Sequence, residues 1–130
     1  MKKTVKSANL YALNDLRYED TSLMECKCDE VLVEIRSCGI CGSDISRVYT
    51  KGTYHFPTII GHEFSGKVVY DPEDKLFGKK VVVFPLLPCF ECESCKVGSY
   101  ATCENYDYYG SRRDGNPICK KKRLSWCKQF

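Results

Sequence analysis

The sequence has little of what a membrane-spanning or secreted protein needs. Its longest apolar run, VVVFPLLP at residues 81–88, is too short to cross a bilayer and contains Pro85. The opening residues MKKTVK start no apolar secretory segment, and the chain has no internal repeat or low-complexity stretch. At 130 residues the chain is sized for one domain. We therefore expect a single-domain protein without a membrane segment.

A basic surface spread over the chain is also lacking. The formal net charge is +3, but residues 119–130 hold five lysines and arginines and no acid. A nucleic-acid surface is usually spread over a folded face or interleaved with aromatic side chains, so a solvated tail is the simpler interpretation. A zinc-binding nucleic-acid module that uses this tail remains an alternative, although the charge pattern disfavours nucleic acid as a partner.

Cysteine, in contrast, is abundant, with ten residues in the chain. Four of them lie in the stretch CFECESCKVGSYATC, separated by two, two and seven residues: Cys89, Cys92, Cys95 and Cys103. Four thiolates close the tetrahedral coordination of zinc, and such a site supports structure rather than catalysis. Disulfides are disfavoured, because cysteines so close in sequence seldom reach relaxed disulfide geometry. We therefore expect a structural zinc site and a reducing, cytoplasmic location.

An iron–sulfur cluster is the rival interpretation of the same cysteines. Three cysteines at two-residue gaps also open a bacterial ferredoxin motif, which closes after three residues with Cys-Pro. Here the last gap is seven residues and Glu104 follows the fourth cysteine. An iron–sulfur electron carrier therefore remains an alternative function.

A second group of residues has the chemistry of a catalytic metal site. The segments ICGSD and GHEFSG contain Cys41, Ser43, His62 and Glu63. A catalytic zinc needs three ligands from cysteine, histidine and carboxylate plus one open position, and Cys41, His62 and Glu63 supply that set. Zinc bound in this way lowers the pKa of a coordinated water or alcohol, and the Ser43 hydroxyl could carry the released proton outward.

The remaining histidine and cysteines have simpler interpretations. We expect His55 to be an ordinary surface or core residue. Cys38 forms a CxxC with Cys41, but no βαβ pattern surrounds it, so we expect a small buried side chain rather than a redox group. The other cysteines receive no role: Cys26, Cys28, Cys119 and Cys127.

The hydrophobic pattern predicts short strands, many turns and one short helix, as in a compact all-β barrel or sandwich. Val31, Val33 and Ile35 should share the buried face of one strand, with Glu34 and Arg36 on its other face. The helix should follow Gly39, with Ser43 or Asp44 as its N-cap. The other predicted elements are a hairpin at 10–20, a strand, turn and strand at 56–70, a turn at 71–78 and a strand at 79–84 that ends at Pro85 and Pro88.

Taken together, CGSD, GHEFSG and the four-cysteine loop resemble the zinc-dependent medium-chain alcohol and polyol dehydrogenases. The resemblance covers 10–115 and is nearest to the galactitol-phosphate and sorbitol dehydrogenase branch, through SCGICGSDISRVYTKGTYHFPTIIGHEFSG and PLLPCFECESCKVGSYATCENYDYYGSRRDG. It implies a GroES-like β-barrel domain at 1–115, joined in full-length members to a Rossmann domain that binds NAD or NADP. The implied substrate is a small alcohol, polyol or polyol phosphate.

The resemblance also implies roles for individual residues. Cys41, His62 and Glu63 would hold the catalytic zinc, Ser43 would relay the proton, and Cys89, Cys92, Cys95 and Cys103 would hold the structural zinc. In some relatives the residue matching Glu63 lies in the second shell, and another carboxylate, from beyond the end of this chain, binds the metal. Arg47 and Lys51 follow the relay motif and could receive a phosphate group.

The sequence departs from the family after SRRDG. Relatives continue with a strand close to GFAEY, whereas this chain continues NPICKKKRLSWCKQF, and no GxGxxG for a dinucleotide occurs in its 130 residues. We therefore expect a truncated dehydrogenase, inactive alone, whose basic tail at 116–130 arises from a shifted reading frame. The tail does not alternate apolar and polar residues, so we expect that it cannot replace the strand it displaces. Open strand edges would then favour a homo-oligomer.

Overall fold

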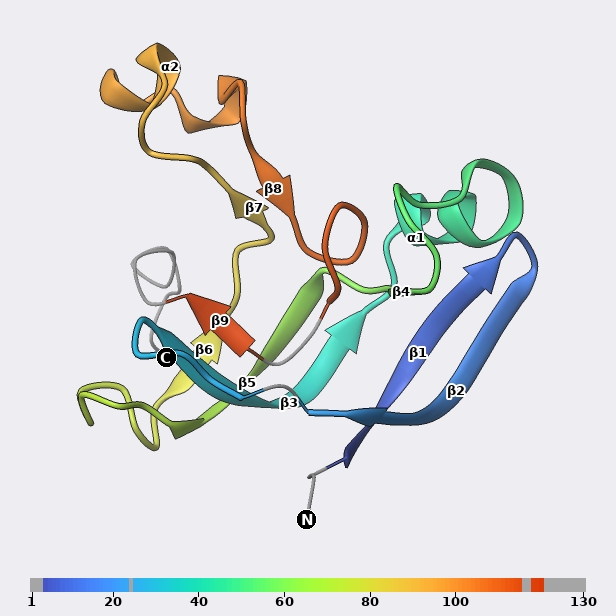
Figure 1. Ribbon diagram of the computed structural model, residues 1–130, viewed down its shortest axis with the longest axis horizontal. Coiled ribbons are helices and arrows are strands. Elements are labelled where there is room, and N and C mark those ends of the chain that lie inside the picture. Colours follow the sequence, from blue (N-terminus) through green and yellow to red (C-terminus); the bar gives the residue numbers. More distant parts are fainter. Residues whose placement is uncertain (1–3, 24, 116–117, 121–130) are drawn as a thin grey trace.

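The computed structural model describes residues 4–23, 25–115 and 118–120, the last three by their backbone (Figure 1). Its strands are β1 (Thr4–Ala12), β2 (Asp15–Ser22), β3 (Glu30–Gly39), β4 (Thr58–Ile59), β5 (Glu63–Tyr70), β6 (Lys80–Val82), β7 (Leu86–Leu87), β8 (Asp107–Tyr108) and β9 (Ile118–Lys120). Its helical turns are α1 (Gly42–Ser46), η1 (Arg47–Lys51), α2 (Glu93–Lys96) and η2 (Tyr100–Thr102). The mainly β architecture predicted from the sequence is confirmed.

The β1–β2 hairpin confirms the predicted hairpin. The turn between its strands places Asn14 at φ 64°, a left-handed conformation that asparagine tolerates better than most residues. On its other side β1 pairs with β4 through Leu10 and Thr58. This three-stranded sheet, in the order β2-β1-β4, therefore positions the segment that leads into the GHEFSG motif.

The core lies against a four-stranded sheet with the order β6-β5-β3-β9. Val31 and Val33 are fully buried there, as the alternating pattern predicts, but Ile35 is 37% exposed. The prediction for Ile35 is wrong: Ile35 pairs with Gly66, which has no side chain to cover it, and the register between β3 and β5 shifts directly after Ile35. The buried cluster consists of Val31, Val33, Phe64, Val68, Val81, Val83, Leu87 and Tyr109.

The segment after Gly115 contains a strand, contrary to the expectation that this strand is lost. The backbone of β9 pairs antiparallel with β3 between Glu30 and Leu32, so the start of β3 does not have an open edge there. An unpaired strand edge readily accepts another extended segment, which accounts for the pairing. The rest of the predicted basic tail, residues 116–117 and 121–130, lies outside the described residues.

Two segments differ in detail from the predicted secondary structure: the proline-flanked strand region and the four-cysteine loop. The strand expected at 79–84 is limited to β6, and β7 forms separately between Pro85 and Pro88, where it pairs with β8. The short helix α2 inside the four-cysteine loop was not predicted. In Figure 1, β7 and β8 lead to a lobe carrying α2 that extends away from the larger sheets.

No helix among the described residues has the length and apolar character needed to cross a membrane.

Candidate metal centres

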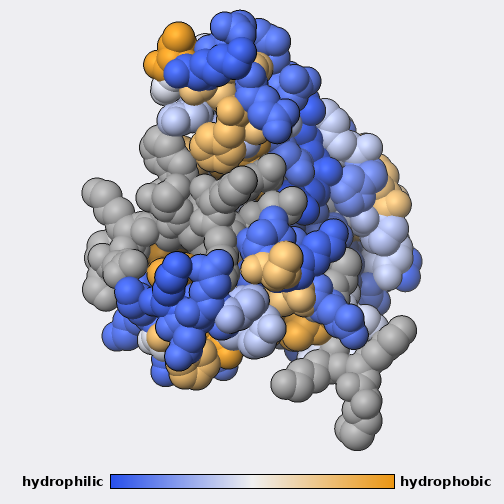
Figure 2. All heavy atoms as spheres, turned by 60° about the vertical axis from the view of Figure 1, so that its left-hand side comes forward, coloured by the Kyte–Doolittle hydropathy of each residue, from blue (hydrophilic) through white to orange (hydrophobic). Residues whose placement is uncertain are grey.

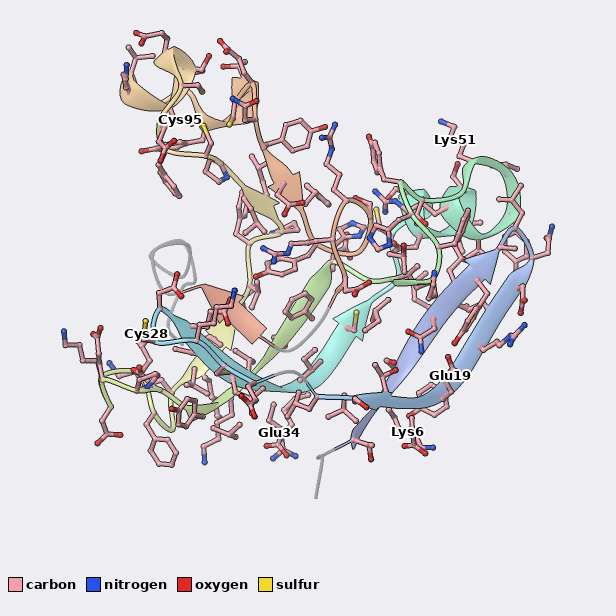
Figure 3. All side chains as sticks on the ribbon, in the orientation of Figure 1. Lys6, Glu19, Cys28, Glu34, Lys51 and Cys95 are labelled. Atoms are coloured by element: carbon pink, nitrogen blue, oxygen red, sulfur yellow. The ribbon has the colours of Figure 1, made fainter. Side chains whose placement is uncertain are left out.

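The four predicted zinc ligands meet in the lobe at the end of β7 and β8. Their sulfur atoms all lie within 4.8 Å of one another, with 3.9 Å between Cys89 and Cys95 and 4.0 Å between Cys92 and Cys103. A tetrahedral zinc site with Zn–S bonds of 2.3 Å requires sulfur–sulfur separations of about 3.8 Å. The four thiols therefore fit a closed zinc site, and Figure 3 shows Cys95 inside this lobe.

Backbone amides favour the thiolate form of Cys89. The amides of Glu91 and Cys92 donate to the sulfur of Cys89, at 3.4 and 3.3 Å, and lower the pKa of the Cys89 thiol to about 6. Burial has the opposite effect on Cys95, since it raises the pKa of that thiol to about 12. A bound metal ion would offset the effect of burial on the pKa of Cys95, because a coordinating thiol is deprotonated by the metal.

The second predicted set also converges, although its members are separated by more than twenty positions in the sequence. One ligand atom from each of Cys41, His62 and Glu63 lies within 4.8 Å of the others. Nε2 of His62 is 4.0 Å from Oε1 of Glu63. This separation is wider than the edge of about 3.4 Å in a tetrahedral site with 2.1 Å bonds. The Glu63 side chain is 51% exposed, so a small rotation can close the difference.

The backbone around these residues explains how they meet. Cys41 is the N-cap of α1, and His62 and Glu63 stand at the start of β5. The predicted N-caps, Ser43 and Asp44, are wrong because both lie inside the helix. Instead, Oδ2 of Asp44 accepts a hydrogen bond of 3.0 Å from the amide of Cys41. The carboxylate therefore fixes the Cys41 backbone and leaves the Ser43 hydroxyl for other contacts.

Asp44 is the functional residue that sequence reasoning missed. It is 4% exposed, and its Oδ1 lies 3.2 Å from both Nδ1 of His62 and Nη1 of Arg47. The alignment with His62 falls short of a good hydrogen bond, so this buried nitrogen is unsatisfied among the described residues. A carboxylate behind a metal-binding histidine orients the ring and raises its basicity. The signal was present in CGSD, where the aspartate follows the cysteine ligand by three positions.

Close packing of two glycines holds the histidine loop. Gly61, at φ 103°, directly precedes His62, and a Cβ on Gly110, at φ 71°, would lie 2.3 Å from the carbonyl oxygen of Gly61. The ring of Tyr108 packs 5.5 Å from the His62 ring, and burial raises the pKa of Tyr108. The strand that leads out of the cysteine lobe therefore supports the second cluster.

Ser43 opens onto a pocket beside the second cluster. Its Oγ accepts a hydrogen bond of 3.0 Å from Nη1 of Arg47, and both residues line a pocket of about 440 Å³. The pocket also contains Lys51, Thr53 and Tyr54. A hydroxyl that accepts one hydrogen bond keeps its own proton and a second lone pair for a ligand. This arrangement suits the predicted relay.

The structure also locates the residues without a predicted role. Cys38 is exposed, so the prediction of a buried side chain is wrong. It lies near the end of β3, opposite Phe64 of β5. His55 was expected to be an ordinary surface or core residue, and it lies at the surface. Its Nδ1 is 3.0 Å from the carbonyl oxygen of Pro57. Cys26 and Cys28 are free thiols.

Comparisons with known proteins agree with this geometry. Residues 27–120 match the family described as "Alcohol dehydrogenase GroES-like domain". Galactitol 1-phosphate 5-dehydrogenase of Escherichia coli is 49% identical over 90 residues, 67% of this chain and 26% of the relative. Sorbitol dehydrogenase of Bombyx mori is 38% identical over 122 residues, 88% of this chain and 35% of the relative.

A solved structure shows the same architecture. The crystal structure of galactitol-1-phosphate dehydrogenase from Escherichia coli superimposes with a TM-score of 0.87 at 37% sequence identity. The match covers 97% of this chain and 38% of that one, so the predicted GroES-like fold is confirmed. The chain spans between about a quarter and two-fifths of the length of these three proteins.

Proposed function

Because this chain belongs to the alcohol dehydrogenase GroES-like domain family, we propose that it binds two zinc ions and forms the zinc-dependent part of a polyol or polyol-phosphate dehydrogenase site. The observation that carries the proposal is the convergence of Cys41, His62 and Glu63 beside a pocket lined by Ser43. The names of the relatives, a galactitol-phosphate and a sorbitol dehydrogenase, support a polyol as the substrate class.

The two sites have different tasks in this proposal. The four cysteines at 89, 92, 95 and 103 hold a structural ion that ties the lobe together, since four thiolates leave no position for a ligand. Cys41, His62 and Glu63 would supply three ligands to the second ion and so leave one position for a substrate or water. Zinc held there lowers the pKa of an alcohol or water that binds to it.

The residues around the second site orient the substrate and move its proton. The Ser43 hydroxyl takes the proton from the alcohol and passes its own toward the pocket, while Arg47 donates to the serine oxygen and holds it in place. Asp44 keeps Nδ1 of His62 directed away from the ligand position, which leaves Nε2 for the metal.

The proposal assigns only part of the reaction to these residues. Hydride transfer needs a nicotinamide cofactor. The 130 residues contain no GxGxxG motif for a dinucleotide-binding turn. We therefore propose that this chain does not catalyse the reaction alone. NAD would act only where a full-length relative supplies the residues that bind it. The metal chemistry can be tested without turnover.

Cobalt substitution tests whether the second site is open. Co²⁺ should occupy both sites, and imidazole should change the visible spectrum of the Cys41 site because it can bind the open position. In Cys41→Ser the response to imidazole should be lost while the four-thiolate spectrum remains. Cys26→Ser removes a thiol outside both clusters and should behave as the wild type. A wild-type spectrum that imidazole leaves unchanged would refute the open site.

A further inference from the structure

We propose that the pocket beside Ser43 binds the phosphate group of a phosphorylated polyol, with Lys51 and Arg47 as the phosphate-recognition residues. The inference rests on the proposed function, because it takes the second metal site to be the place where the polyol reacts. It goes further by distinguishing phosphorylated from free polyols. The relatives include both kinds of dehydrogenase by name, so family membership leaves this choice open.

The size and position of the pocket suit one small phosphorylated ligand. Its volume of about 440 Å³ lies in the lower part of the range of about 300–1,000 Å³ for small-molecule sites. Of the residues that line it, Ser43 is the nearest in sequence to the proposed ligand Cys41, separated from it by Gly42 alone. A ligand that fills the pocket therefore reaches the relay hydroxyl.

The charge of the lining favours an anion. The pocket contains the cations Arg47 and Lys51, and no carboxylate is among the described residues that line it. Within the part of the chain that the structure describes, Lys51 forms no ion pair, whereas Arg47 is paired with Asp44 at 3.2 Å. An unpaired ammonium on the wall of a pocket provides a strong site for a dianionic phosphate.

Arg47 is preorganised for the same task. Its side chain is 19% exposed, and its contacts with Ser43 and Asp44 both use Nη1. A guanidinium carries five N–H donors, so it can hold the serine and still donate to a ligand. A buried pairing with Asp44 reduces the rotamer freedom that binding would otherwise have to remove.

The backbone after η1 brings the remaining walls together. Gly52 adopts φ 75°, and a Cβ there would lie 3.0 Å from the ring of Phe56. This tight bend directs Lys51 and Tyr54 to the same pocket, and Figure 3 shows Lys51 on the turn that ends η1. The guanidinium of Arg112 lies 4.6 Å from the Tyr54 ring and 4.5 Å from the Tyr106 ring, which holds the tyrosine wall against the next loop.

Calorimetric titration of the zinc-loaded full chain tests the subsite, with galactitol 1-phosphate, galactitol and inorganic phosphate as probes. We expect galactitol 1-phosphate to bind more tightly than galactitol and inorganic phosphate. Lys51→Gln should weaken its binding about 10-fold or more, as for the loss of a charge-assisted contact, and leave galactitol unchanged. Lys79→Gln, which removes an exposed lysine before β6, should match the wild type within about 2-fold.

Three results would overturn the subsite: no measurable binding of galactitol 1-phosphate, equal affinity for galactitol and its phosphate, or equal effects of Lys51→Gln and Lys79→Gln. Zinc content is measured in the same samples. If both zinc ions are present and the phosphate has no effect, the subsite is wrong and the metal proposal stands. If zinc is absent from the Cys41 site, the proposed function fails, whatever the phosphate binding shows.

Discussion

At the scale of single residues, Asp44 connects the parts of the second site. One carboxylate accepts from the amide of Cys41, pairs with Arg47 and lies against Nδ1 of His62. A buried carboxylate needs such partners, because an unpaired charge in the interior is strongly destabilising. The backbone of Cys41, the ring of His62 and the guanidinium of Arg47 therefore all depend on the same side chain.

Replacing this carboxylate should weaken the second metal site selectively. In Asp44→Asn we expect metal affinity at the Cys41 site to fall about 10–100-fold, since an amide orients the imidazole less strongly than a carboxylate does. Chelator competition with Co²⁺-loaded protein measures both sites separately. Asp20→Asn removes an exposed carboxylate paired with Lys6 and serves as the control. Equal retention of cobalt in the two variants would contradict the role given to Asp44.

At the scale of elements, glycines allow the loops of the second site to approach each other. Gly110 leads out of β8 and abuts the backbone of Gly61, which directly precedes His62. Both residues have positive φ angles, a conformation that costs other residues energy. The contact links the strand from the cysteine lobe to the histidine loop.

A pair of glycine substitutions distinguishes the energetic effect of this contact from that of backbone strain alone. Gly98, at φ 80°, has open space where a Cβ would stand, so Gly98→Ala should lose only about 1 kcal/mol of unfolding free energy. Gly110→Ala adds a clash with the Gly61 backbone and should lose about 2 kcal/mol more, together with cobalt binding at the Cys41 site. Chemical denaturation of both variants gives the difference. Similar losses in both would show that the glycine contact is unimportant.

The sequence predicts local patterns better than it predicts where they change. Alternation is sufficient to find β3, and Asn14-Asp15 is sufficient to find the first hairpin. Alternation cannot reveal the register shift after Ile35, because a bulge depends on the partner strand. The exposure of Cys38 follows from the same local geometry and was missed for the same reason.

The side chains of the two candidate metal sites are predictable as groups, whereas their surroundings are not. Cysteine, histidine and carboxylate at these spacings are typical of metal ligands, and the structure places each set within 4.8 Å. The sequence predicts Asp44 as an N-cap because its residue type suits both roles, and only tertiary contacts distinguish them. β9 was missed because its pairing with β3 joins segments far apart in the sequence.

At the scale of the whole molecule, the two proposed metal sites occupy different parts of the fold. The four-cysteine lobe extends beyond β7 and β8, while the second site lies between α1 and the start of β5 (Figure 1). On the face shown in Figure 2, the hydrophobic residues form small patches among hydrophilic residues. Among the described strands, the sheet edges are β2 and β4, β6 and β9, and both strands of the β7–β8 pair. Association with another copy through such an edge stays a prediction.

Counting zinc in the intact chain by native mass spectrometry tests the central claim most directly. The account predicts two zinc ions per chain, one in Cys92→Ser, retained by the Cys41 site, and one in Cys41→Ser, retained by the four-cysteine lobe. Cys28→Ser, which removes an exposed free thiol, should still carry two. A wild-type chain that carries iron or no metal, or the same zinc count in all four proteins, would contradict the account.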